Sequence, residues 1–111
     1  MIEITTSASS VTLAIVGDLD LAERDQFPQM AAKINQLCRP RLVIDMCQAV
    51  FMDSAGAGFL ISLAGAAAKH GGTAVLRGIG PRDEFVLEVC GALEMFRIDR
   101  DHTCELSRPS A

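Results

Sequence analysis

One serine, Ser54, stands where the chain leaves a predicted strand and begins a predicted helix. The segment 51–58 reads FMDSAGAG; it follows the apolar residues 42–44 and precedes a helix-compatible run over 59–69. At the start of a helix the first backbone N–H groups lack intrahelical partners, and the helix dipole is positive. Such a position suits a serine that caps the helix, attacks a substrate or carries a phosphate.

Nucleophilic catalysis by Ser54 would need a base that the sequence does not supply. The nucleophile elbow of hydrolases has glycine two residues before its serine, where this chain has Met52. His70 lies roughly 24 Å along the predicted helix, at 1.5 Å per residue. His102 lies in a tail that is polar from about residue 99. Because a serine nucleophile requires a base within hydrogen-bond reach, we expect that the protein is not an enzyme.

The helix after Ser54 decides between a simple cap and a surface for a partner. As an N-cap, Ser54 would contribute around 1 kcal/mol and nothing else. Between residues 55 and 68, however, Ser62 is the only polar side chain. A helix that is apolar all round is either buried or bound to a partner, and a small domain can rarely bury one completely. Five residues of this helix fall close to one line, which either packs against the sheet or receives a partner: Ser54, Gly58, Ser62, Gly65 and Lys69.

Three aspartates, Asp18, Asp20 and Asp53, lie at predicted turns. A parallel sheet would gather these turns at one edge, because the carboxyl ends of parallel strands meet there. Acidic residues at turns are commonly solvated caps. The alternative is that they form part of a docking surface around Ser54.

The elements that must position these residues follow from the hydrophobic pattern. Strands are expected at 2–5 and 11–16 (a hairpin), 41–46 (buried on both sides), 73–77 and 95–98. Helices are expected at 21–37, 54–70 and 81–90. Asp20 is placed to cap the first helix, which Pro28 delays or bends. The order predicts a single α/β domain with a mixed sheet of four to five strands and right-handed crossovers.

Composition excludes several classes of protein. The chain has 111 residues, half of them hydrophobic and 22% charged, as expected for one globular domain. Its net charge of −4 argues against direct nucleic-acid binding, which requires a basic face. No apolar run has the length of a membrane span, and no secretory signal is visible, so we expect a cytoplasmic protein.

The four cysteines form no Cys-x-x-Cys pair, and the two histidines do not complete a zinc pattern with them. We therefore expect no metal and no cofactor. The simplest interpretation is that Cys38, Cys47, Cys90 and Cys104 are reduced thiols, most of them buried. Cys104, near the polar end of the chain, is expected to be the most exposed. A redox role for these cysteines stays open.

The ordered motifs resemble the STAS domain, and most closely the bacterial anti-sigma factor antagonists. The resemblance rests on GDLD at 17–20, on Asp45 in the third strand and on FMDSAGAG at 51–58. It spans nearly the whole chain, from the first hairpin to Phe96, so residues 1–111 are expected to form a single STAS domain with a polar tail.

The resemblance implies a function. In that family, the serine directly after the motif aspartate is phosphorylated by an anti-sigma factor that is also a serine kinase of the GHKL type. That serine is Ser54 here. The unphosphorylated antagonist captures the anti-sigma factor and frees a sigma factor; phosphorylation ends the capture, and a serine phosphatase reverses it. The implied docking residues are Asp18, Asp20, Asp53, Ser54, Ala55, Gly56, Gly58 and Ser62.

The chain departs from the family pattern at three positions. Ala55 stands where many members have a second serine or threonine, Ala57 where a bulky aliphatic residue is usual, and Asp18 where glutamate is common. Asp53 either orients the serine or binds kinase-held magnesium, or it is a turn residue only. A STAS subunit that binds a membrane transporter or a lipid-transport complex without phosphorylation is the alternative function, and a homodimer stays open.

Overall fold

The computed structural model describes residues 1–37 and 40–104 as a five-stranded sheet with helices packed on it. The strands are β1 (Ile2–Thr6), β2 (Ser10–Leu19), β3 (Arg41–Met52), β4 (Thr73–Arg77) and β5 (Arg97–Asp99). The helices are α1 (Phe27–Leu37), α2 (Ser54–Lys69) and α3 (Pro81–Val89), with 3-10 turns η1 (Leu21–Gln26) and η2 (Leu93–Met95). The predicted α/β fold with an N-terminal hairpin is confirmed.

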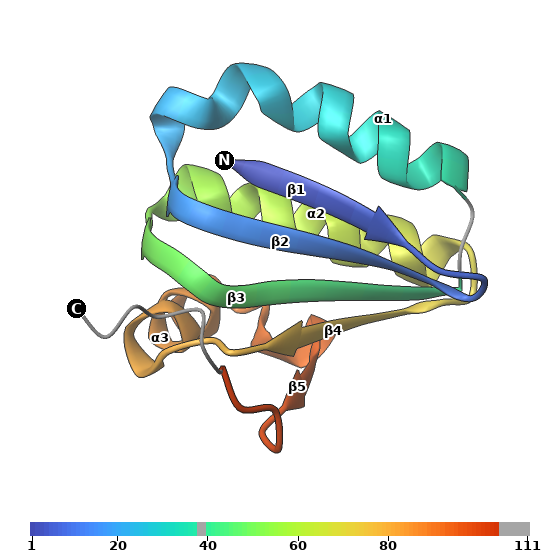
Figure 1. Ribbon diagram of the computed structural model, residues 1–111. Coiled ribbons are helices and arrows are strands. Elements are labelled where there is room, and N and C mark those ends of the chain that lie inside the picture. Colours follow the sequence, from blue (N-terminus) through green and yellow to red (C-terminus); the bar gives the residue numbers. More distant parts are fainter. Residues whose placement is uncertain (38–39, 105–111) are drawn as a thin grey trace.

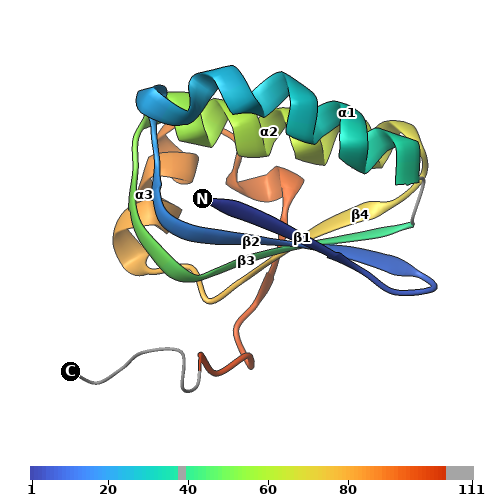
Figure 2. The ribbon, with the colours of Figure 1, turned by 45° about the horizontal axis from the view of Figure 1, so that its top comes forward.

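The strands lie in the sheet in the order in which they occur in the chain, β1-β2-β3-β4-β5. β1 pairs antiparallel with β2, and every later pair is parallel. Because each right-handed crossover leads to the next strand in the same direction, the connecting helices are placed on one face. Figures 1 and 2 show α1 and α2 side by side over the same side of the sheet, and α3 contacts α2. The carboxyl ends of β2 and β3 therefore meet at one edge, from which η1 and α2 begin.

The core lies between the sheet and α2. Leu13, Ile44 and Leu76 from three adjacent strands have no exposed surface, and Leu60 and Leu63 of α2 pack in the same cluster. Full burial of one such side chain stabilises the fold by about 1.5–3 kcal/mol. This packing holds α2 on the sheet and so determines where its first residue emerges.

Element boundaries differ from expectation where local chemistry intervenes. The helix expected at 21–37 begins with a 3-10 turn, and the α-helix starts at Phe27, one residue before Pro28. Proline has no N–H to donate and therefore favours the first turn of a helix. β3 continues six residues beyond the expected Met46, to Met52, through register shifts against β2. The last strand begins at Arg97, two residues later than expected, because η2 occupies 93–95.

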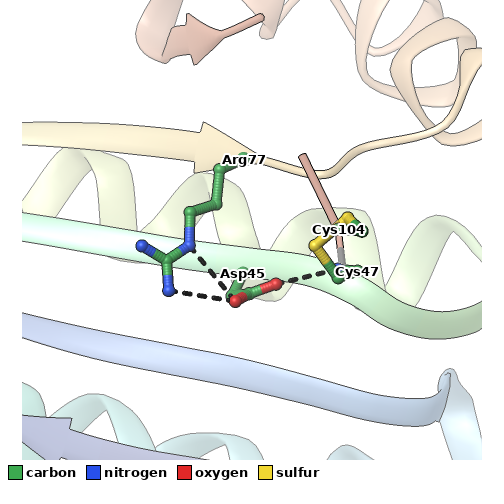
Figure 3. Close-up of a disulfide and its surroundings, with 4 residues drawn as sticks. All are labelled: Asp45, Cys47, Arg77 and Cys104. Atoms are coloured by element: carbon green, nitrogen blue, oxygen red, sulfur yellow. Dashed lines mark hydrogen bonds and ion pairs between the residues drawn. A yellow bond between two sulfur atoms is a disulfide. The ribbon is translucent and has the colours of Figure 1, made fainter. Parts of the chain in front are cut away.

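The cysteines differ most from the expectation of four reduced, mostly buried thiols. Cys47 and Cys104 form a disulfide, and Cys90, not Cys104, is exposed. Figure 3 shows this bond beside the ion pair of Asp45 and Arg77. Cys38 and the tail beyond residue 104 lie outside the described residues. Tertiary folding joins two cysteines that are 57 residues apart in the sequence.

None of the described helices combines the length and the hydrophobicity that crossing a bilayer requires.

Candidate functional site

Ser54 is the first residue of α2, and its side chain is exposed. The cap of the helix is the preceding residue, Asp53, whose Oδ1 accepts a hydrogen bond from the backbone N–H of Gly56 at 3.0 Å. The interpretation of Ser54 as the N-cap of this helix is therefore wrong. Among the residues that the structure describes, no side-chain hydrogen bond involves the Ser54 hydroxyl, so it is available to another molecule.

Asp53 holds two helix starts together. Its second oxygen, Oδ2, accepts a hydrogen bond from the backbone N–H of Leu21 at 3.1 Å, at the first residue of η1. The hydrogen bond from Gly56 is the largest influence on the Asp53 carboxyl and holds its pKa below the usual value. The carboxylate is therefore ionised near neutral pH. Both oxygens of Asp53 therefore hold backbone N–H groups, one at the start of η1 and one in the first turn of α2.

Gly56 brings the start of α2 against the end of β2. A Cβ atom at this position would overlap with the carbonyl oxygen of Leu19, which also accepts a hydrogen bond from the N–H of Asp53 at 3.3 Å. Gly56 is buried. Gly56 is therefore removed from the predicted docking residues and has a packing role instead. The absence of a side chain lets α2 approach β2 closely enough to present Ser54.

The line of small residues along α2 faces outward. Gly58, Ser62 and Lys69 are exposed and Gly65 is half-buried. A Cβ atom on Gly58 would meet nothing within 4 Å, and one on Gly65 would only touch the end of Met95. Close packing of these two glycines against the sheet is therefore wrong. The Ser62 hydroxyl donates to the carbonyl oxygen of Phe59 at 2.7 Å, so its one donor is already used within the helix.

The other two aspartates lie at the same edge of the sheet. Asp20 caps η1, with its Oδ1 accepting a hydrogen bond from the N–H of Ala22 at 3.0 Å. Asp18 is exposed near the end of β2, where the register pairs it with Phe51 of β3. Asp20 and Asp53 lie where η1 and α2 begin, whereas Asp18 lies within β2 and not in the turn that the sequence predicted. Ala55, beside Ser54, is half-buried.

One apolar residue of this region was not anticipated from the sequence. Leu21, whose N–H binds Asp53, leaves 56% of its surface exposed. Contact with a partner would remove this apolar surface from water, which is favourable by about 25 cal/mol per Å². The available signal was that Leu21 lies outside the helical spacing of residues 27, 30, 31, 34 and 37.

The histidines do not form a catalytic site with Ser54. His70 follows the last residue of α2, at the opposite end of the helix from Ser54. His102 has its ring near Cys47 and Cys104 instead. Among the described residues, Ser54 therefore has no hydrogen bond to a histidine.

Comparisons with known proteins agree with this arrangement. The STAS domain family model matches residues 1–103. SpoIIAA of Bacillus in its phosphorylated form superposes with a TM-score of 0.71 at 16% identity, covering 91% of this chain and 93% of that one. An anti-sigma factor antagonist from Mycobacterium paratuberculosis gives 0.77 at 18% identity, covering 90% and 85%. A sulfate transporter family protein from Wolinella succinogenes gives 0.69 at 18% identity, covering 85% and 79%.

These identities are low, so the solved structures establish a common fold only. None of the curated proteins compared with the chain matches it. The family model, in contrast, covers nearly all of the described residues and includes the whole edge that carries Asp20, Asp53 and Ser54. The chain therefore belongs to the STAS domain family.

Proposed function

We propose that the protein is an anti-sigma factor antagonist, which binds an anti-sigma factor with serine kinase activity and thereby releases a sigma factor, until phosphorylation of Ser54 ends the binding. The observation that carries this proposal is the exposed Ser54 hydroxyl at the start of α2. Asp53 takes the capping role that serine would otherwise fill. A kinase can therefore modify Ser54 without breaking a hydrogen bond that holds the fold.

The proposed docking surface combines a flat helix face with an acidic edge. It consists of Asp18, Asp20, Leu21, Asp53, Ser54, Ala55, Gly58 and Ser62. The small residues of α2 permit close approach of a partner, and Leu21 supplies an apolar anchor. This set differs from the sequence-based one by the addition of Leu21 and the loss of the buried Gly56.

A phosphate on Ser54 would be poorly neutralised by its own helix. The N–H of Gly56 donates to the Asp53 carboxylate, and the N–H of Ala57 donates to the Asp53 carbonyl oxygen at 2.9 Å. The added charge of about −1.5 to −2 would therefore stand beside the ionised Asp53 carboxylate. A partner that covers the phosphate must either desolvate its charge or be repelled by it. A loss of a few kcal/mol of binding free energy lowers affinity by roughly two to three orders of magnitude. The fold need not change.

Incubation with candidate GHKL-type kinases and Mg-ATP, followed by mass spectrometry of the intact chain and its peptides, tests the proposal. One phosphate on Ser54 is expected, no phosphate on Ser54→Ala, and removal of the phosphate by a serine phosphatase. Ser62 is a second exposed serine on the same helix and serves as the internal control. Phosphate on Ser62 in place of Ser54, or unchanged capture of the kinase by the phosphorylated chain, would contradict the proposal.

The alternative is a STAS subunit that binds a membrane transporter without phosphorylation. The fold likeness to a sulfate transporter family protein makes this the second candidate. It would use the same face of α2. Capture of a transporter component by both wild type and Ser54→Asp, with no kinase that modifies Ser54, would favour it. For either function the expected location of the protein is the cytoplasm. Light scattering on the same samples measures whether the protein forms a homodimer.

A further inference from the structure

A second group of reactive side chains lies away from the docking surface. After β5 the chain turns back toward β3, where Cys104 is bonded to Cys47 with their Cα atoms 5.4 Å apart. The ring of His102 comes to the same place: the ligand atoms of Cys47, His102 and Cys104 all lie within 4.8 Å of one another. Two thiol sulfurs and one imidazole nitrogen are the donor set that zinc and other thiophilic divalent metals prefer.

Local structure directs each donor to this point. β3 carries a register irregularity against β2 between the pairs Ala14–Asp45 and Val16–Gln48, and Cys47 lies inside it. Irregularities of this kind redirect a side chain. His102 and Cys104 are two residues apart in a segment without helical structure, and this spacing allows both side chains to point the same way.

Gly78, directly after β4, leaves the space for the sulfurs. Its φ of 71° is in the left-handed region that favours glycine. A Cβ atom there would overlap with the Sγ atoms of both Cys47 and Cys104. The backbone of a third segment is thus shaped around this pair of cysteines.

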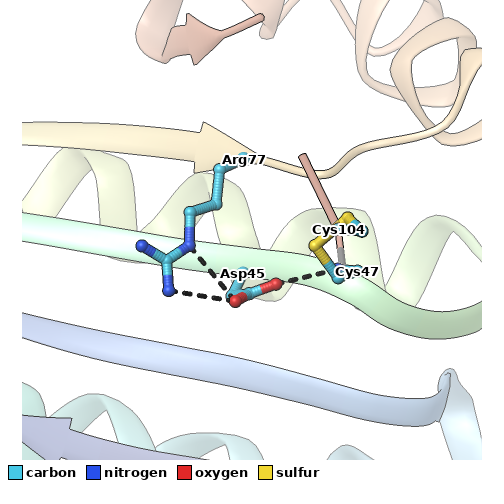
Figure 4. A network of polar contacts seen from close by, with 4 residues as sticks. All are labelled: Asp45, Cys47, Arg77 and Cys104. Carbon is cyan, nitrogen blue, oxygen red and sulfur yellow. Dashed lines mark hydrogen bonds and ion pairs between the residues drawn. A yellow bond between two sulfur atoms is a disulfide. The ribbon is translucent and has the colours of Figure 1, made fainter. Parts of the chain in front are cut away.

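The charges around the group are compatible with a bound cation. The guanidinium of Arg77 is neutralised by Asp45, with Nη2 and Oδ2 3.0 Å apart (Figure 4). The other oxygen of Asp45 accepts a hydrogen bond from the N–H of Cys47 at 2.9 Å. The Asp45 carboxylate thus fixes the backbone from which the Cys47 side chain projects.

We propose that Cys47, His102 and Cys104 form a redox-gated metal site, in which the disulfide is the closed state and the reduced cysteines with His102 bind one Zn²⁺ ion. A dithiol reductant supplies two electrons and two protons, which break the S–S bond and form two thiols, while the dithiol itself becomes a disulfide. Zn²⁺ then replaces both thiol protons and binds the neutral imidazole nitrogen of His102. These three ligands leave the fourth tetrahedral position for water. Oxidation by a disulfide such as oxidised glutathione reverses the first step through two thiol exchanges, with release of the metal.

The change between the two states is small. Zn–S bonds of about 2.3 Å in tetrahedral geometry place two sulfurs roughly 3.8 Å apart. The donors already lie within 4.8 Å, so the S–S bond opens with little movement of the backbone. Reducing compartments keep cysteines as free thiols, so the metal-binding state would prevail there.

Titration of the full chain with Co²⁺ and then Zn²⁺ tests the proposal. Reduced protein, freed of reductant without air, is expected to bind one Co²⁺ per chain with a thiolate-to-cobalt charge-transfer band, which Zn²⁺ abolishes. The oxidised chain is expected to bind none. Cys104→Ser and His102→Ala should weaken binding at least about tenfold, a change of about 1.4 kcal/mol. Cys90→Ser, which removes the exposed cysteine outside the site, should leave it unchanged.

Two further measurements keep the result interpretable. His102 and Cys104 lie after the last strand, so their variants are expected to keep the fold, which circular dichroism checks. Zn²⁺ should also protect Cys47 and Cys104, but not Cys90, from alkylation in the reduced chain. Absence of the charge-transfer band in the reduced chain, equal binding by the oxidised chain, or unchanged binding by Cys104→Ser overturns the proposal.

Discussion

Leu21 and Asp53 are joined by a hydrogen bond from the Leu21 N–H to the Asp53 Oδ2 at 3.1 Å, although they are 32 residues apart in the sequence. The other carboxylate oxygen receives the N–H of Gly56. One side chain therefore holds the start of η1 and the start of α2 in a common position. This is the edge of the sheet at which Ser54 is presented, so the geometry of the docking surface depends on Asp53.

Asp53→Ala is expected to lower the free energy of unfolding by about 1–2 kcal/mol, because it removes an N-cap and leaves a second backbone N–H without its partner. Urea unfolding measures the change. Asp18→Ala removes an exposed carboxylate from the same edge and is the matched control, with an expected effect within about 0.5 kcal/mol. Equal effects of the two substitutions would show that Asp53 does not hold the helix starts.

The contribution of Asp53 is also expected to depend on pH. The hydrogen bond from Gly56 lowers the pKa of the folded state below that of the unfolded chain. The stabilisation is therefore present above the unfolded pKa of about 3.9 and is lost as pH falls through the lower folded value. Asp53→Asn should flatten the fall in stability below about pH 4. If the free energy of unfolding, measured with urea, fell below about pH 4 in this variant as it does in wild type, the assignment to Asp53 would be contradicted.

Gly56 and Gly58 should respond oppositely to alanine. In Gly56→Ala the new Cβ would overlap with the Leu19 carbonyl oxygen, so we expect a loss of more than about 3 kcal/mol or failure to fold. In Gly58→Ala the new Cβ meets nothing within 4 Å, and the higher helix propensity of alanine should add about 0.5–1 kcal/mol. Thermal unfolding of the pair tests this; a stable Gly56→Ala would show that α2 can shift away from β2.

Substitution of Ser54 separates charge from shape in partner binding. Ser54→Ala should bind the anti-sigma factor as tightly as wild type, and it should keep this affinity when ATP is added because it cannot be phosphorylated at residue 54. Ser54→Asp should bind at least about tenfold more weakly, since it adds one charge beside Asp53. Titration calorimetry with the purified partner gives both values. Ser9→Asp adds the same charge at an exposed serine in the turn between β1 and β2, outside the docking surface, and is the control. Wild-type affinity in Ser54→Asp would exclude the charge mechanism.

Leu21 is expected to contribute to binding without contributing to stability. Its side chain is 56% exposed, so Leu21→Ala should change the free energy of unfolding by less than about 0.5 kcal/mol. If the partner covers this side chain, truncation removes apolar surface that would be buried, and we expect a loss of about 1 kcal/mol, or roughly fivefold in affinity. Val89→Ala removes an apolar side chain of α3 that is 68% exposed; it is the control and should leave affinity unchanged. Equal affinity of wild type and Leu21→Ala would place Leu21 outside the interface.

Much of the fold could be predicted from the sequence, because strands, helices and their order are written in local hydrophobic periods. The continuous apolar run of β3 and the glycines that end α2 placed Ser54 at a strand-to-helix junction, and the structure has it there. The parallel order of β2 and β3 likewise followed from the helix that connects them.

Other features were decided only by tertiary structure, because they depend on contacts between distant segments. Local sequence allowed either Asp53 or Ser54 to cap α2, and the additional hydrogen bond from Leu21 belongs to Asp53. The pairing of Cys47 with Cys104 requires the irregular register of β3 and the return of the chain after β5. Spacing along a chain carries no information about such approaches; only the packed sheet brings these atoms together.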